Sequence, residues 1–178
     1  MSADSEIGKR MWENMILDQV LDSLPMITGR TVTDEWEGEA EQIDGSPDHI
    51  LGLDGKPLGI ELTEVRNVDD AQGYVDEAYR LALKKSDSYT RRDIFRFPIV
   101  LVMHSAEPPL FDLRESLDEA VEQSDFEVLG FAEIWAIDFS DAYYSVGDPR
   151  RRADMFCFKP HEWFGFHRLG FGDRKPFG

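Results

Sequence analysis

The chain has 178 residues, of which 42% are hydrophobic, 12% aromatic and 31% charged, a composition typical of a globular domain rather than of a disordered or membrane-embedded chain. No apolar run approaches the roughly 20 residues of a membrane-spanning helix, and acids interrupt residues 1–20, so we expect a cytoplasmic protein with neither a membrane segment nor a secretory signal. The formal net charge of −17 disfavours wholesale binding to nucleic acid or to anionic membranes, and it leaves local basic patches as the places for such contacts.

The first part of the chain predicts a helix followed by three strands. Apolar residues recur at three- and four-residue steps over residues 6–24, which is the spacing of an amphipathic helix, and Pro25 predicts its end. Residues 28–42 alternate β-branched and aromatic residues with acids, which indicates an exposed or edge strand. Two strand-like runs then flank Asp54 and Gly55, a pair that supplies the positive φ angles of a tight hairpin turn.

The remaining elements alternate between helices and strands. We expect a helix over 69–90, a buried central strand over 97–105, a helix over 112–124, a strand or strand pair over 126–140 broken near Gly130, and a last strand over 155–160. The order α-β-β-β-α-β-α-β-β predicts a single α/β domain over residues 1–178, with a central mixed β-sheet flanked by helices. Residues 161–178 are rich in glycine and aromatic residues, which predicts an irregular C-terminal tail.

Two carboxylates stand on opposite arms of the predicted hairpin. Because the Asp-Gly turn folds the strands back antiparallel, Asp48 comes opposite Glu61, and such cross-strand neighbours have Cβ atoms about 5 Å apart. Two carboxylates at that distance repel each other unless a cation lies between them. Hard oxygen ligands suit Mg²⁺ or Mn²⁺. Period-two alternation places Glu61 and Thr63 on one face of the strand and Leu62 on the other.

Pro47-Asp48, with Glu61 on the following strand in the run IELT, resembles the motif of the PD-(D/E)XK nuclease superfamily. The order of elements over residues 6–104 is also similar to that family's core of helix, three-stranded meander, helix and strand. The resemblance implies a restriction-endonuclease-like fold. It also implies a Mg²⁺ or Mn²⁺ ion held by Asp48, Glu61 and the main-chain carbonyl of Leu62.

The sequence departs from the family motif at Thr63, where the family has a lysine. Some members supply that lysine from the neighbouring helix, and Lys85 is the preferred stand-in here, one helical turn before Tyr89 and on the same face. Weaker stand-ins are Lys84, Lys56 and Glu64. The resemblance further implies an acid on the first helix, for which the candidates are Glu13, the better placed, and Glu6. The candidate contacts to nucleic-acid phosphates are Arg91, Arg92 and Tyr89.

Three hypotheses for function stay open. The first is a metal-dependent nuclease that hydrolyses phosphodiester bonds in nucleic acid. For such an enzyme a homodimer is plausible, because cutting both strands of a duplex commonly uses two copies. The second is a catalytically inactive member of the same fold that binds nucleic acid or a protein, and the surplus of acids favours a partner with a basic surface. The third is an unrelated α/β domain whose hairpin is structural.

Two other residues, a histidine and a cysteine, have side chains that could act in catalysis or metal binding, but we expect structural roles for both. His104 ends the predicted central strand, and we interpret it as a hydrogen-bonded strand-end residue, with metal ligation as the alternative. Cys157 is the only cysteine, which excludes an intrachain disulfide and a cysteine cluster for zinc. We expect it to be a small apolar residue of the last strand.

Overall fold

The structure is a computed structural model that describes residues 3–28, 31–33, 46–66, 68–91, 97–105, 110–138 and 154–159. Its elements in chain order are α1 (Ala3–Thr28), β1 (Val32–Thr33), β2 (His49–Leu53), β3 (Lys56–Glu64), α2 (Ala71–Arg91), β4 (Ile99–Ser105), α3 (Leu110–Glu122), the 3₁₀ turn η1 (Phe126–Val128), β5 (Glu133–Asp138) and β6 (Asp154–Lys159). Among the described residues, no helix combines the length and the apolar character needed to cross a membrane. The predicted tail over 161–178 lies outside the described residues.

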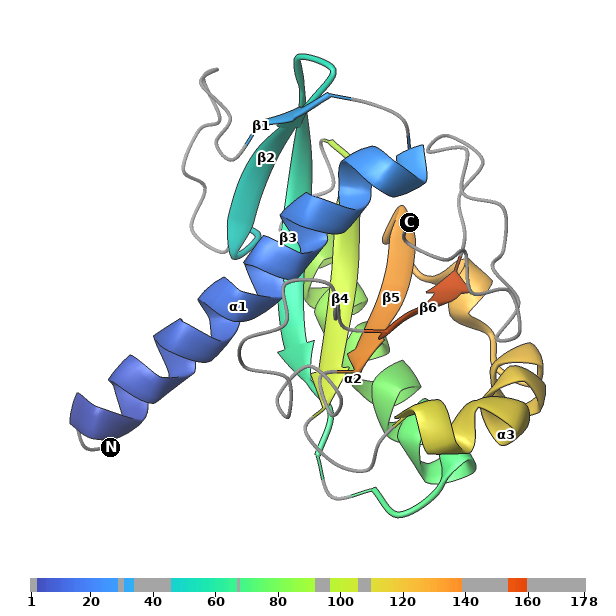
Figure 1. Ribbon diagram of the computed structural model, residues 1–178. Helices are drawn as coiled ribbons and strands as arrows, with labels where there is room; N and C mark the ends of the chain where they lie inside the picture. The colour runs from blue at the N-terminus through green and yellow to red at the C-terminus, as the bar shows by residue number, and fades with distance from the viewer. Residues whose placement is uncertain are drawn as a thin grey trace.

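Six strands form one mixed sheet in the order β1-β2-β3-β4-β5-β6. The β3–β4 and β4–β5 pairs are parallel, while the β1–β2, β2–β3 and β5–β6 pairs are antiparallel. Helix α1 crosses one face of this sheet, and α2 and α3 cover the other face (Figure 1). The prediction of an α/β domain with a central mixed sheet between helices is therefore confirmed.

The strands are apolar where helices cover them. All seven residues of β4 are buried, as expected for a central strand with parallel neighbours on both sides. Alternate residues of the strands contribute to two separate clusters, one with Ile16 and Val20 of α1 and one with Tyr74 and Ala78 of α2. This alternation fixes which face of the sheet each strand residue occupies.

The hairpin forms with the predicted register. Asp54 and Gly55 have φ angles of 50° and 71°, as a turn with two positive φ angles requires. His49 pairs with Ile60 at the far end of the ladder, so Asp48, one residue before β2, comes level with Glu61 on β3.

Three predicted elements differ from the structure. Helix α1 does not end at Pro25 but continues to Thr28; the fixed φ of proline is compatible with a helix, at the cost of one hydrogen bond and of crowding between the ring and the carbonyl of residue 21. The segment 126–140, expected as a strand or strand pair, begins instead with η1, and the strand β5 starts only at Glu133. The strand expected over 28–42 is β1, of two described residues at the sheet edge, and residues 34–45 lie outside the described part.

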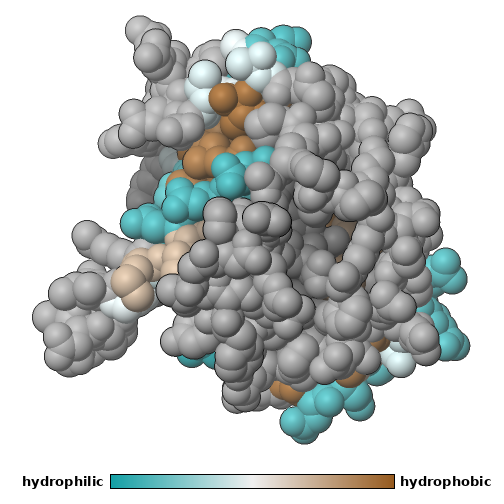
Figure 2. Space-filling model, viewed as in Figure 1, coloured by the Kyte–Doolittle hydropathy of each residue, from teal (hydrophilic) through white to brown (hydrophobic). Residues whose placement is uncertain are grey.

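Part of α1 runs beyond the sheet. Figure 1 shows its N-terminal turns leaving the body of the domain, and Figure 2 shows a small, weakly hydrophobic patch at the base of the protruding part. The exposed large hydrophobic residues of α1 in the described part of the chain are Met11 and Met15, at 63% and 37% exposure. The packed section of the helix follows them, with Ile16 and Val20 fully buried.

Candidate active site at the end of the hairpin

Asp48 is positioned by the residue before it and by the strand opposite. Pro47 is buried and lies directly over Gly59 of β3, where an added Cβ would be only 2.8 Å from the proline Cγ. The absence of a side chain at Gly59 thus lets the chain enter the hairpin close to β3. The carboxylate of Asp48 then reaches along β3, where its Oδ2 accepts a hydrogen bond of 2.8 Å from the backbone N–H of Leu62.

Glu61 is a buried carboxylate, 5% exposed, on the face of the sheet that α2 covers. Its Oε1 accepts a hydrogen bond from the Lys85 ammonium, and its Oε2 accepts one from the Tyr89 hydroxyl. Lys85 and Tyr89 are one turn apart on α2, so both side chains point at the same position on β3. A charge buried in this way is tolerated when it is paired and hydrogen-bonded, and Glu61 is both.

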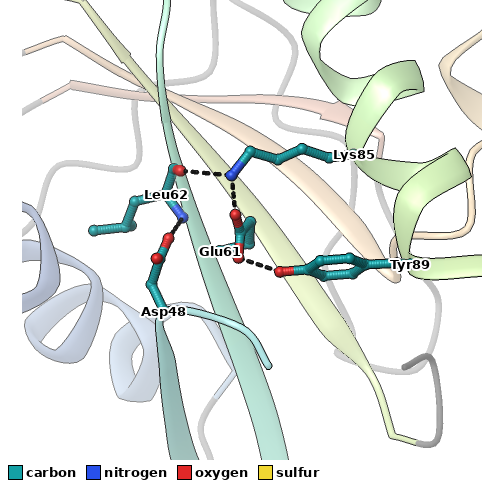
Figure 3. A network of polar contacts seen from close by, with 5 residues as sticks. All are labelled: Asp48, Glu61, Leu62, Lys85 and Tyr89. Atoms are coloured by element: carbon teal, nitrogen blue, oxygen red, sulfur yellow. Dashed lines mark hydrogen bonds and ion pairs between the residues drawn. The ribbon is translucent and has the colours of Figure 1, made fainter. Parts of the chain in front are cut away.

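The backbone of Leu62 joins the two carboxylates into one network (Figure 3). Its N–H donates to Asp48, and its carbonyl accepts a hydrogen bond of 3.2 Å from Lys85 Nζ. The ladder between β2 and β3 ends at the pair of His49 and Ile60, so side chains take over as partners of the next backbone groups on this side of β3. The ammonium of Lys85 consequently bridges a carboxylate oxygen and a carbonyl oxygen, both of which accept hydrogen bonds from it.

Thr63 contributes a buried hydroxyl with no hydrogen-bond partner among the described residues. The residue is 7% exposed and lies on the same face of β3 as Glu61, two positions along the strand. A buried hydroxyl without a partner costs about 1–3 kcal/mol. Such groups are retained at positions where a ligand or an ordered water completes the hydrogen bond.

The donor atoms of this network fit a hard divalent cation. Asp48, Glu61 and the Leu62 carbonyl present oxygen atoms only, which suits Mg²⁺ or Mn²⁺ rather than a softer metal. Two of these donors, Glu61 Oε1 and the Leu62 carbonyl, already hold a positive group, the Lys85 ammonium. Within the described ranges no three acids, histidines or cysteines gather as a metal cluster, and Mg²⁺ needs only one or two protein carboxylates because it keeps several waters.

Among the other predicted site residues, Tyr89 joins this network, whereas Glu13 and Arg91 do not. Glu13 stands on α1, which packs on the opposite face of the sheet from the Glu61 side chain. Tyr89 is 7% exposed, so it belongs to the surroundings of Glu61 and is not a surface contact. Arg91 is exposed, and its guanidinium lies 4.0 Å from Asp87. Arg92 lies outside the described residues.

His104 has the hydrogen-bonded, strand-end role that the sequence predicts. Its Nδ1 accepts a hydrogen bond of 3.2 Å from Trp12 Nε1, across the face of the sheet that α1 covers. Burial lowers the pKa of His104 to about 4, while Glu64 raises it and Arg66 lowers it further. The ring is therefore neutral near pH 7, with its proton on Nε2, and it lies on the opposite face from Glu61.

Sequence reasoning missed the bond between Tyr89 and Glu61. The spacing of Lys85 and Tyr89 shows that they share a helix face, but the face that α2 turns toward the sheet is what makes the tyrosine a partner of the carboxylate. The signal available in the sequence is the apolar stripe of the helix, because Tyr74, Ala78 and Ala82 are buried on the side of α2 that packs on the sheet.

Comparison of the chain with protein-family models, with curated proteins and with solved structures finds no match.

Proposed function

We propose that this protein is a metal-dependent nuclease with a restriction-endonuclease-like fold. The observation that carries the proposal is the network in which Asp48 and Lys85 bond the backbone of Leu62 and Lys85 also bonds Glu61. Residues far apart in the sequence supply two carboxylates, one carbonyl and one ammonium at a single point of β3. The order of α1, the meander β1-β2-β3, α2 and β4 supports the same assignment, because that order is the core of the resembling family.

The residues of this chain take distinct roles in the proposed hydrolysis. Asp48, Glu61 and the Leu62 carbonyl would hold Mg²⁺ or Mn²⁺, and that ion would supply an acidified water and offset charge on a phosphate oxygen. Tyr89 fixes the orientation of Glu61 through its hydroxyl. Lys85 supplies a positive charge beside the scissile phosphate. Water adds to phosphorus, the phosphorus–oxygen bond to the leaving nucleotide breaks, and the products are a phosphate monoester and a hydroxyl end.

The second candidate function is a catalytically inactive module of the same fold. The observation that favours it is the Lys85 ammonium itself, which occupies Glu61 Oε1 and the Leu62 carbonyl. If that bridge is permanent, the lysine serves as a structural counter-ion for a buried carboxylate. The protein then binds a partner through another surface, and the carboxylates do not take up metal.

Calorimetric titration with Mn²⁺ tests the two candidates directly. Under the nuclease proposal the native protein binds Mn²⁺, and Asp48→Asn lowers the affinity at least about tenfold, which corresponds to about 1.4 kcal/mol. Asp87→Asn is the matched control, because it removes a carboxylate that is exposed on α2 and outside the network. Equal and negligible heats from native protein and Asp48→Asn would support the inactive module.

Cleavage assays test the chemical step separately from metal binding. Native protein with Mg²⁺ or Mn²⁺ should cut duplex DNA, single-stranded DNA or RNA, and Glu61→Gln should abolish the cutting while Asp87→Asn retains it. Cutting that survives in Glu61→Gln would point to a contaminating nuclease. Metal binding without cleavage of any of these substrates would retain the cation site and remove the nuclease assignment.

A further inference from the structure

Lys85 occupies the same oxygen atoms that the proposed function assigns to a metal ion. Its Nζ donates to Glu61 Oε1 and to the Leu62 carbonyl, which are two of the three proposed donors. Each of these oxygens has two lone pairs, but an ammonium and a divalent cation on the same atoms carry like charges a few ångströms apart and repel each other. Binding of the metal therefore favours release of the ammonium.

We propose that Lys85 is an internal counter-ion that a divalent cation displaces, so that the site holds either the ammonium or the metal. This inference rests on the proposed function, because it concerns the same donor atoms. In the metal-free state Lys85 neutralises a carboxylate that is only 5% exposed. In the metal-bound state the cation takes over that neutralisation, and the ammonium is released from Glu61.

The surroundings of Lys85 allow the exchange. Its side chain is 31% exposed, whereas that of Glu61 is 7% exposed, so the ammonium has a path to solvent while the glutamate stays largely buried. The lysine stem is flexible, with four carbons that can carry the ammonium several ångströms without movement of the helix backbone. Tyr89 donates to Glu61 Oε2, the oxygen that Lys85 does not contact, so this bond can hold the orientation of the carboxylate when its other oxygen changes partner.

The exchange reverses the sign of the charge at the site. Asp48 and Glu61 outweigh Lys85 in the metal-free state, and the three side chains together are negative. Addition of a divalent cation makes the same group positive, with the released ammonium as part of it. A phosphodiester is therefore repelled before the metal binds and attracted afterwards, so each of the two ligands raises the affinity of the site for the other.

Mn²⁺ affinity in two lysine variants tests the displacement. Lys85→Met removes the competing ammonium and keeps the length of the stem, so its Mn²⁺ affinity should be about tenfold higher than that of the native protein. Lys84→Met removes the same charge from the neighbouring exposed position and should change the affinity less than about threefold, because solvent and salt screen an exposed charge. Electron paramagnetic resonance of unbound Mn²⁺ gives both affinities.

A labelling experiment on the native protein avoids any risk that Lys85→Met fails to fold. Brief acetylation followed by mass spectrometry measures how accessible each lysine is, with and without Mn²⁺. The proposal predicts that Mn²⁺ increases labelling of Lys85 several-fold and leaves Lys84 unchanged. Asp48→Asn, which weakens the metal site, should suppress the increase.

The outcomes separate this inference from the proposed function. Native protein that binds Mn²⁺ with no change in Lys85 labelling, or a Lys85→Met variant that binds no more tightly, would overturn the displacement and leave the metal site standing. Absence of Mn²⁺ binding in both the native protein and Lys85→Met would overturn both. Binding by Lys85→Met alone would support the displacement strongly, because the ammonium would then be the barrier to the metal.

Discussion

Protonation of His104 should destabilise the fold as the pH falls from 6.5 toward 4. The residue is 5% exposed, and its burial lowers the pKa from 6.5 to about 4. In the unfolded chain the same histidine titrates near its ordinary value, so within this range the unfolded state binds more protons than the folded state. The free energy of unfolding therefore rises with pH across the range and falls with acid.

The size of the stability loss follows from the size of the pKa shift of His104. A lowering of the pKa from 6.5 to about 4 corresponds to about 3 kcal/mol of folding stability that is present at pH 7 and lost by pH 4. A second cost adds to the same step, because a protonated Nδ1 becomes a donor and can no longer accept the hydrogen bond from Trp12. The substitution His104→Asn removes the titrating ring and retains an oxygen that can accept the indole N–H.

Urea unfolding measured at steps between pH 7 and pH 4 provides the assay. We expect the native protein to lose about 3 kcal/mol more than His104→Asn over this range. The comparison of two proteins cancels the titration of the 36 acids, which both share. Parallel pH profiles for the two would refute the reasoning, because they would show that His104 binds protons equally well in the folded and unfolded states.

Three further substitutions test packing and polar contacts by chemical denaturation at pH 7. Gly59→Ala places a methyl group 2.8 Å from Pro47 and should cost about 1–3 kcal/mol; an unchanged midpoint would show that the proline can move. Tyr89→Phe removes the hydroxyl from buried Glu61 and should also cost about 1–3 kcal/mol, and no loss would mean that water replaces it. Asp70→Ala removes an acceptor 2.7 Å from the backbone N–H three residues later, at the start of α2; we expect a loss of about 1 kcal/mol, with most of it recovered in Asp70→Asn.

The hairpin could be predicted from sequence because all its determinants are local. The Asp-Gly pair demands a turn with positive φ, alternation sets the faces, and counting outward from the turn brings Asp48 level with Glu61, as the strand register shows. The central strand β4 can also be predicted from sequence, because its apolar run is continuous and of the same length as the strand. Helical spacing placed Lys85 and Tyr89 on one face of α2, and the structure brings that face to Glu61.

The remaining features depend on contacts between distant parts of the chain. Neither the hydrogen bond from Trp12 to His104 nor the position of Pro47 over Gly59 leaves a local pattern in the sequence. The segment around Phe126 has the composition of a strand, but it folds as η1 because its aromatic side chain packs against Tyr79 and Phe158. Tertiary packing overrides propensity in such short segments.

The two hydrogen bonds of Leu62 make this residue a spectroscopic reporter. Its amide proton points at Asp48 and its carbonyl at Lys85, although the ladder to β2 has already ended. The amide should exchange slowly with solvent for as long as Asp48 holds it, and its proton resonance should move when that carboxylate turns toward another partner. One backbone resonance, followed in a nitrogen–proton correlation spectrum, would thus register events at Asp48 without any substitution in the network.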